Sequence, residues 1–156
     1  MKAITIREEG RIDTGFAANL QFDGGEYPVT ITDPFTPKEE KLLEWYFEEW
    51  VMCPLTNTVI AERAAASVKI YGESLFKQVF QNRDAYSLYR QLRGNLSQVQ
   101  IEIVAKTPEF HALHWEALQD PDLSRPLAVD CVMLRKNVRP APPVSANVQL
   151  SIGLVE

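Results

Sequence analysis

The residues best suited to chemistry lie in the segment "PEFHALHWEALQDPD", residues 108–122. This segment holds both histidines of the chain, His111 and His114, three residues apart and beside a tryptophan and a glutamate. Two imidazoles at that spacing share one face if the segment is helical. They would then suit a metal site or, together with Cys131, a cysteine nucleophile and its base. The segment therefore decides whether the sequence predicts an enzyme.

The number of available ligands disfavours a metal site. Zinc takes three or four protein ligands, and the segment lacks the His-Glu-x-x-His arrangement of zinc hydrolases. The two cysteines, Cys53 and Cys131, lie far apart in the chain, which is poor support for a disulfide framework or a four-ligand zinc site. We predict no metal, no cofactor and reduced thiols.

A catalytic pairing of Cys131 with either histidine is also disfavoured. Cys131 lies inside the apolar run "LAVDCVML", and reactive thiols occupy exposed, electropositive surroundings. Cys53 follows a glutamate-rich segment, whose carboxylates disfavour a thiolate. We therefore predict no catalytic residue, and a small enzyme using His111, His114 and Cys131 stays as the third alternative.

Trp115 and Glu116 have a functional and a structural interpretation. The pair would present a stacking face and an acid to a ligand, or a core side chain and a carboxylate bonded to backbone or arginine. An isolated pair is no catalytic constellation, so the structural interpretation is favoured. The following basic cluster, Arg135, Lys136 and Arg139, is expected to be solvated and to pair with nearby carboxylates.

Composition limits the classes of protein that remain. With 156 residues, 46% of them hydrophobic and 24% charged, the chain is long enough for one globular domain, residues 1–156, with a real core. A net charge of -5 and a pI near 5.1 provide no basic surface, so no nucleic-acid partner is predicted. The sequence shows neither an apolar run of ~20 residues nor a secretory signal, which predicts no membrane partner and a cytoplasmic location.

Hydrophobic periodicity predicts an α+β fold. The runs "KAITIRE", "TGFAANLQF" and "YPVTITD" alternate partly between apolar and polar residues, with glycines between them, which predicts a small amino-terminal antiparallel sheet. Pro28 favours an edge position or a strand start. "QVQIEIVA", "PLAVDCVML" and "NVQLSIGLV" predict carboxy-terminal strands, and residues 139–146 read as a proline-rich linker before the last of them.

Helical signals fill the middle of the chain. The segment "TPKEEKLLEWYFEEWV" opens with a capping box of Thr36 and Glu39, and its next residues place an apolar stripe at helical spacing that is predicted to be core: Leu43, Tyr46, Phe47 and Trp50. A second helix is expected from about Asn57 to Gln81. A third is expected to start at an Asp84 cap and to end at a left-handed Gly94.

The order of these segments resembles the amino-terminal region of CHAT proteins, which are caspase-like domains associated with tetratricopeptide repeats. "EEKLLEWYFEEWV", which contains Trp45, is followed by "YGESLFKQVF", "LYRQLRG", an alternating strand and the histidine-containing segment. The family's proline-glutamate, leucine, Pro-Trp-Glu-x-Leu pattern is matched by Pro108-Glu109, Leu113, His114-Trp115-Glu116 and Leu118. His114 departs from it, because the family usually has a proline there to fix a backbone turn.

The resemblance implies a caspase-like sheet and a parent cysteine peptidase. In the family, the catalytic histidine and cysteine both follow the first strand after this pattern, which "NVQLSIGLVE" resembles, so no residue of this chain inherits a catalytic role. The matched residues Trp45, Leu113, Trp115, Glu116 and Leu118 are expected to be structural. The expected function is a non-catalytic structural or regulatory portion, whose partner is the remainder of the parent protein.

A self-standing protein-interaction module without enzymatic activity is the alternative function. If residues 147–155 form a strand with a free apolar edge, the isolated chain is expected to self-associate by strand pairing. Light scattering across micromolar concentrations measures this, and a clean monomer would contradict it.

Overall fold

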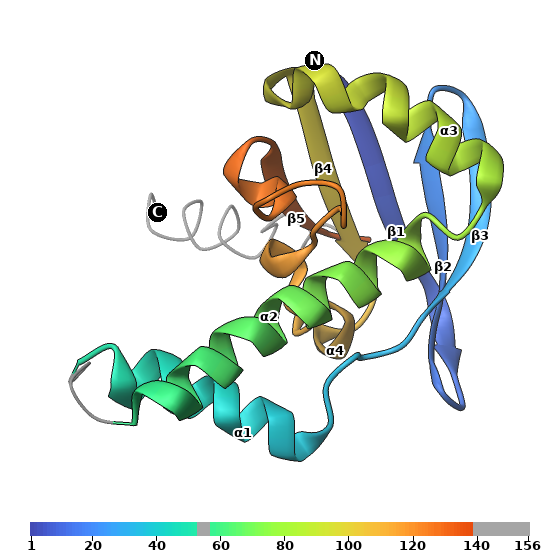
Figure 1. Cartoon of the computed structure of the whole chain (residues 1–156). Helices are drawn as coiled ribbons and strands as arrows, with labels where there is room; N and C mark the ends of the chain where they lie inside the picture. Colours follow the sequence, from blue (N-terminus) through green and yellow to red (C-terminus); the bar gives the residue numbers. More distant parts are fainter. Residues whose placement is uncertain (53–56, 139–156) are drawn as a thin grey trace, which may run out of the picture.

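The computed structural model describes residues 1–52 and 57–138, and it has a five-stranded sheet in the order β3-β2-β1-β4-β5 (Figure 1). The first three strands pair antiparallel, and they are β1 (Lys2–Ile12), β2 (Gly15–Phe22) and β3 (Gly25–Ile31). β4 (Val99–Ala105) runs parallel to β1, and β5 (Val132–Asn137) runs parallel to β4. The predicted α+β class is confirmed.

Within the described residues, four α-helices accompany the sheet. α1 (Pro37–Trp45) continues into a π-helical turn (Tyr46–Trp50), and α2 (Thr58–Val79) and α3 (Arg83–Leu92) follow. The short α4 (Pro108–His111) comes after β4, and 3₁₀ turns lie at Arg93–Gln98, Trp115–Ala117 and Leu127–Val129. α2 and α3 cross one face of the sheet, whereas α1 and the first half of α2 form a helical hairpin that extends beyond it (Figure 1).

The core lies between the sheet and the helices. Alternate residues of β1 and β4 point inward, so that Ile4 pairs with Ile101 and Ile6 with Ile103 across the parallel β1–β4 ladder. The residues between them are partly exposed, as expected for a sheet with helices on one face. The β2–β3 hairpin turns at Asp23 and Gly24, both with positive φ, and the following edge strand carries Pro28, as predicted.

Several predicted boundaries are wrong. Within "PLAVDCVML" the strand begins only at Val132. Leu127 starts a 3₁₀ turn instead, and the Leu127 amide donates to the Leu118 carbonyl at 2.8 Å. The cap of α3 is Asn82 rather than Asp84, since the Asn82 carboxamide oxygen accepts two backbone N–H groups. Gly94 lies in a 3₁₀ turn that continues from α3, so no left-handed residue is needed there.

The predicted start of α1 is confirmed, but its apolar stripe is only partly buried. Thr36 and Glu39 form the capping box, and Leu43 is 5% exposed. Phe47, in contrast, is 58% exposed. The π-helical turn closes with a bond from the Val51 amide to the Tyr46 carbonyl, which changes the 3.6-residue period on which the stripe was based.

Candidate functional site

A buried carboxylate of β1 positions the start of the segment 108–118, called here the Trp-Glu segment. Glu8 is fully buried, and its Oε2 accepts the backbone N–H groups of Lys106 and Thr107 at 2.7 and 2.9 Å. The Thr107 hydroxyl donates to the other Glu8 oxygen and caps α4 by accepting from the Phe110 amide. Together with a proline at the first helical position, these bonds determine where α4 begins.

Glu8 is a structural residue that the sequence prediction missed. Its signal was present, because Ile4, Ile6 and Glu8 alternate on the face of β1 that points into the core. A buried carboxylate needs hydrogen-bond donors, and here they come from a turn about a hundred residues later in the chain.

The tryptophan of the Trp-Glu segment belongs to the core. Trp115 is 0% exposed, its ring centroid lies 5.1 Å from that of Phe110, and its indole N–H donates to the Phe110 carbonyl at 2.8 Å. Leu113 and Leu118 are buried beside it, whereas Trp45 is half-buried at the end of α1. The structure therefore gives Trp115 a packing position with no face open to a ligand.

Glu116 connects the segment to β5. Both of its carboxylate oxygens lie 2.6 Å from Nη2 of Arg135, and Arg135 also donates to the carbonyl of His111. Partial burial raises the pKa of Glu116. The hydrogen bond and charge of Arg135, together with contributions from the backbone of Glu116 and from His114, outweigh burial, so the pKa lies below its ordinary value. The next basic residue, Lys136, pairs with Glu102 at 2.8 Å, as expected, and Arg139 lies outside the described residues.

The two histidines bind different elements and do not form one site. α4 ends at His111, so the segment is not a continuous helix, and His111 Nε2 lies 3.2 Å from the side-chain oxygen of Asn137. His114 Nε2 lies 2.6 Å from Glu40 on α1, and its backbone N–H donates to the Tyr71 hydroxyl at 3.0 Å. The His114 φ of -78° would suit a proline, but a proline could not donate that bond.

Cys131 is buried, and its surroundings disfavour the thiolate. Burial, and to a smaller extent the charge of Asp130, raises the pKa of its thiol to about 11. Within residues 1–52 and 57–138, no hydrogen bond joins Cys131 to an imidazole, and no three His, Cys, Asp or Glu side chains gather as a metal site. Cys53 lies outside the described residues.

The reactivity of Cys131 is a direct test. In a Cys53→Ser variant at pH 8, we expect the native thiol to react with a thiol reagent about two orders of magnitude more slowly than in urea, because a pKa near 11 leaves little thiolate. Absorbance of the released chromophore follows both rates. Equal rates in the native and unfolded chain would contradict the buried position.

α2 crosses the Trp-Glu segment at a glycine. The Gln119 amide donates to the Gly72 carbonyl at 3.1 Å, and a Cβ on Gly72 would lie 1.8 Å from the carbonyl oxygen of Ala117. The residue at this crossing therefore has to be glycine, because backbone atoms on both sides leave no room for a side chain.

A Gly72→Ala substitution is expected to lower the free energy of unfolding by about 1–3 kcal/mol, through overpacking against backbone. Urea denaturation followed by circular dichroism measures it. Gly94→Ala is the matched control, since nothing lies within 4 Å of a Cβ there. A Gly72→Ala variant as stable as the control would show that the two backbones separate freely.

Beside this crossing lies an apolar hollow of about 230 Å³. It is open on one side and bounded by α1, α2 and the Trp-Glu segment, with a lining that includes Phe35, Leu43, Phe47, Val68, Tyr71 and Ala117. Ligand pockets for drug-sized molecules are usually about 300–1,000 Å³, so this hollow has room for one or two side chains. Its lining is mainly apolar, and we take it as the candidate site.

Comparison of the chain with protein-family models, with curated proteins and with solved structures finds no match in any of the three. No helix among the described residues is both long enough and apolar enough to cross a bilayer. The fold and the site thus define an α+β domain whose histidines, Trp115 and Glu116 join its elements together.

Proposed function

We propose that the chain is the non-catalytic amino-terminal portion of a CHAT-type, caspase-like cysteine peptidase and that it packs against, or positions, the catalytic portion. The order of motifs along the sequence supports this, as does the position of the matched residues. Trp115 at the centre of the pattern is fully buried, and Glu116 beside it bonds to β5. The observation that carries the proposal is that Trp115 and Glu116, which match the family pattern, pack and bond within the fold. A cytoplasmic location is part of the same proposal.

The partner in this proposal is the remainder of the parent protein, and the edge strand β5 is the natural place for it. Among the described residues β5 pairs only with β4, and its Val132 and Leu134 are 43% and 37% exposed. A parallel edge with apolar side chains is normally covered by another strand or layer. The strand expected at 147–155 lies outside the described residues.

The size of the natural polypeptide tests the proposal. We expect an antibody raised to this chain to detect, in source cells, a band well above 17.7 kDa. A band at 17.7 kDa, present from the moment of synthesis in a pulse-chase, would contradict it, because the catalytic portion would be missing.

A self-standing interaction module is the second candidate, and the exposed apolar side chains of the helical hairpin favour it. The small Cys/His enzyme has less support. His111 contacts Asn137, His114 contacts Glu40, and the Cys131 thiol is buried. An enzymatic activity of the chain that is lost on changing any of His111, His114 and Cys131 would support it.

A further inference from the structure

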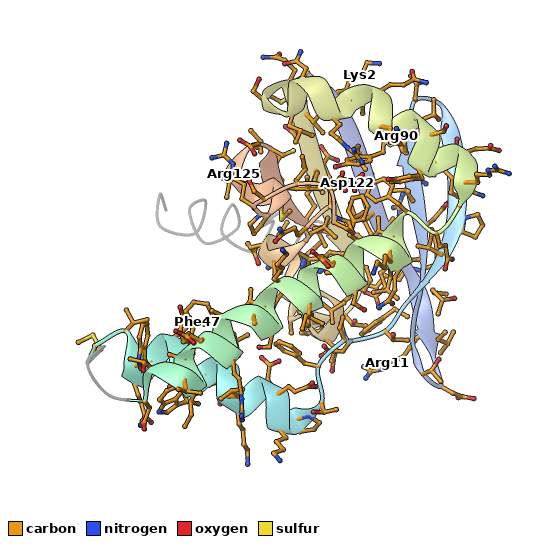
Figure 2. All side chains as sticks on the ribbon, viewed as in Figure 1. Lys2, Arg11, Phe47, Arg90, Asp122 and Arg125 are labelled. Atoms are coloured by element: carbon orange, nitrogen blue, oxygen red, sulfur yellow. The ribbon has the colours of Figure 1, made fainter. Side chains whose placement is uncertain are left out.

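The first half of α2 has an exposed apolar face. Val59 and Ile70 are 65% and 67% exposed, and Ala66 is exposed between them. Their spacing of seven and four residues places them on one side of the helix, opposite the buried Ala64 and Leu75. This part of α2 belongs to the helical hairpin that extends beyond the sheet (Figure 1), and Figure 2 shows side chains projecting from both helices of the hairpin. Uncovered apolar surface of this kind commonly marks an interaction site.

The hairpin carries charges of both signs, and they are separated along its length. Near its projecting end lie four glutamates that form no ion pair within the described residues: Glu44, Glu48, Glu49 and Glu62. Farther from that end lie three lysines: Lys38, Lys41 and Lys69. Arg63 is an exception near the acidic end, and the carboxylates of Glu39 and Glu40 already contact Thr36 and His114. Because both signs are present, net charge does not select a partner, but the order of the charges makes two oppositely directed hairpins complementary.

One register of two antiparallel α2 helices suits both the charges and the apolar residues. When the two-fold axis passes between positions 65 and 66, Glu62 of each copy is level with Lys69 of the partner subunit. Val59 of each copy is then within about 3 Å, along the helix axis, of Ile70 of the partner subunit, since the rise is about 1.5 Å per residue. Glu62 and Lys69 are seven residues apart and lie on the same side of the helix, which lets them meet across the axis. We call Val59, Glu62, Ala66, Lys69 and Ile70 the α2 face.

The charges favour the antiparallel register over a parallel one. A parallel pair would place Glu62 against Glu62 and Lys69 against Lys69. In the antiparallel register the two Arg63 side chains lie on the other side of the α2 face and about 7.5 Å apart along the axis, so they do not oppose each other directly. Within one chain, Lys69 lies 3.9 Å from Glu73, and its side chain is 59% exposed. An exposed contact of that length is weak, so it leaves Lys69 available to a second copy.

We propose that two copies of the chain pair through the α2 face in antiparallel orientation, with Glu62 of each copy against Lys69 of the partner subunit. Two helices in contact over about three turns form a small interface beside the about 1,200–2,000 Å² of stable complexes, so we expect a weak, reversible dimer. This interaction goes beyond the CHAT proposal and does not depend on it. It also uses other residues than the strand pairing expected for residues 147–155.

Sedimentation equilibrium of the whole chain tests the pairing. From about 10 μM to about 1 mM protein, we expect a reversible equilibrium between monomer and dimer. Its dissociation constant is expected to rise at least threefold between about 0.05 and about 0.5 M salt, because salt screens the pairs of Glu62 with Lys69. A monomer over the whole range, or a dimer that salt does not weaken, would overturn the proposal.

Charge exchange identifies the paired residues. Glu62→Lys and Lys69→Glu are each expected to raise the dissociation constant at least tenfold, because like charges then meet twice in one dimer. The double variant is expected to return to within threefold of the unaltered chain, because both pairs are restored with reversed sign. Glu26→Lys on β3 and Arg90→Glu on α3 are matched controls that should leave the dimer unchanged. Circular dichroism and urea midpoints confirm that each variant folds. A double variant as weak as the single ones would overturn the pairing.

Other forms of self-association give distinct results in the same measurement. Ile70→Ser is expected to weaken the dimer at least threefold, whereas Val129→Ser, at a similarly exposed position outside the α2 face, should not change it. Equal losses at the two positions would contradict the assignment to the α2 face. A dimer that Leu150→Lys dissociates and that charge exchange at positions 62 and 69 leaves unchanged would assign the self-association to residues 147–155 and overturn the α2 pairing.

Discussion

A Trp115→Ala variant is expected to lose about 3–5 kcal/mol of unfolding free energy, the cost of deleting a fully buried aromatic side chain. The loss of buried apolar area is only part of the reason for this expected destabilisation. The indole ring packs against Phe110, and its N–H satisfies the Phe110 carbonyl, which would be left buried without a donor. A loss of that size is a large part of the about 5–15 kcal/mol that stabilises an ordinary domain.

Urea denaturation monitored by far-ultraviolet circular dichroism measures the Trp115→Ala change. Trp115→Phe keeps most of the packing and loses the hydrogen bond, so its loss should be intermediate. Trp45→Ala is the matched control, since that tryptophan is half-buried on α1 and its removal should cost clearly less. Similar losses at Trp45 and Trp115 would mean that the Trp-Glu segment does not hold the core together.

An Asp120→Ala variant is expected to lower the free energy of unfolding by about 3–5 kcal/mol, because it breaks a buried charged network. Asp120 is 0% exposed, accepts the Tyr89 hydroxyl at 2.9 Å and lies 2.9 Å from Nε of Arg93. The Arg93 Nε–H is not aimed at the carboxylate, so that contact is ionic rather than a directed hydrogen bond. Burial, and then the bond to Asp120, raises the pKa of Tyr89 and keeps it protonated as the donor.

Asp122 provides the control for Asp120. It also contacts Arg93, at 3.0 Å, but its side chain is 62% exposed, so Asp122→Ala should cost less than about 1 kcal/mol. Asp120→Asn keeps an acceptor for Tyr89 and should fall between the two. If Asp120→Ala were as stable as Asp122→Ala, the buried network would contribute nothing to the packing of α3 on the segment 119–122.

Local pattern was enough to predict most elements of the fold. Strict alternation predicted β4 with Val99, Ile101 and Ile103 inward, and the capping box predicted the start of α1. Both signals depend on neighbours a few residues away, so no tertiary information was needed. The structural interpretation of Trp115 and Glu116 depended on a different argument, that an isolated pair is no catalytic constellation.

Local pattern failed where one part of the chain changes the geometry of another. Phe47 was predicted to be core from its helical spacing to Leu43. It lines the same hollow as Leu43 but is 58% exposed, because spacing along one helix does not determine whether another element covers that face. Asp84 and Asn82 are both good caps, and only the backbone path into α3 selects Asn82. The shared helical face of the two histidines was lost when α4 ended at His111.

The sequence by itself determined the α+β class, the start of α1, the alternation of β4 and the burial of Cys131, because periodicity and capping are local. Only the tertiary structure decided the parallel pairing of β1 with β4, which brings Glu8 to the turn at Lys106. It alone decided the crossing of Gly72 over Ala117 and the hollow beside it. Those features join segments that are distant in sequence, and their energies depend on contacts that no local pattern encodes.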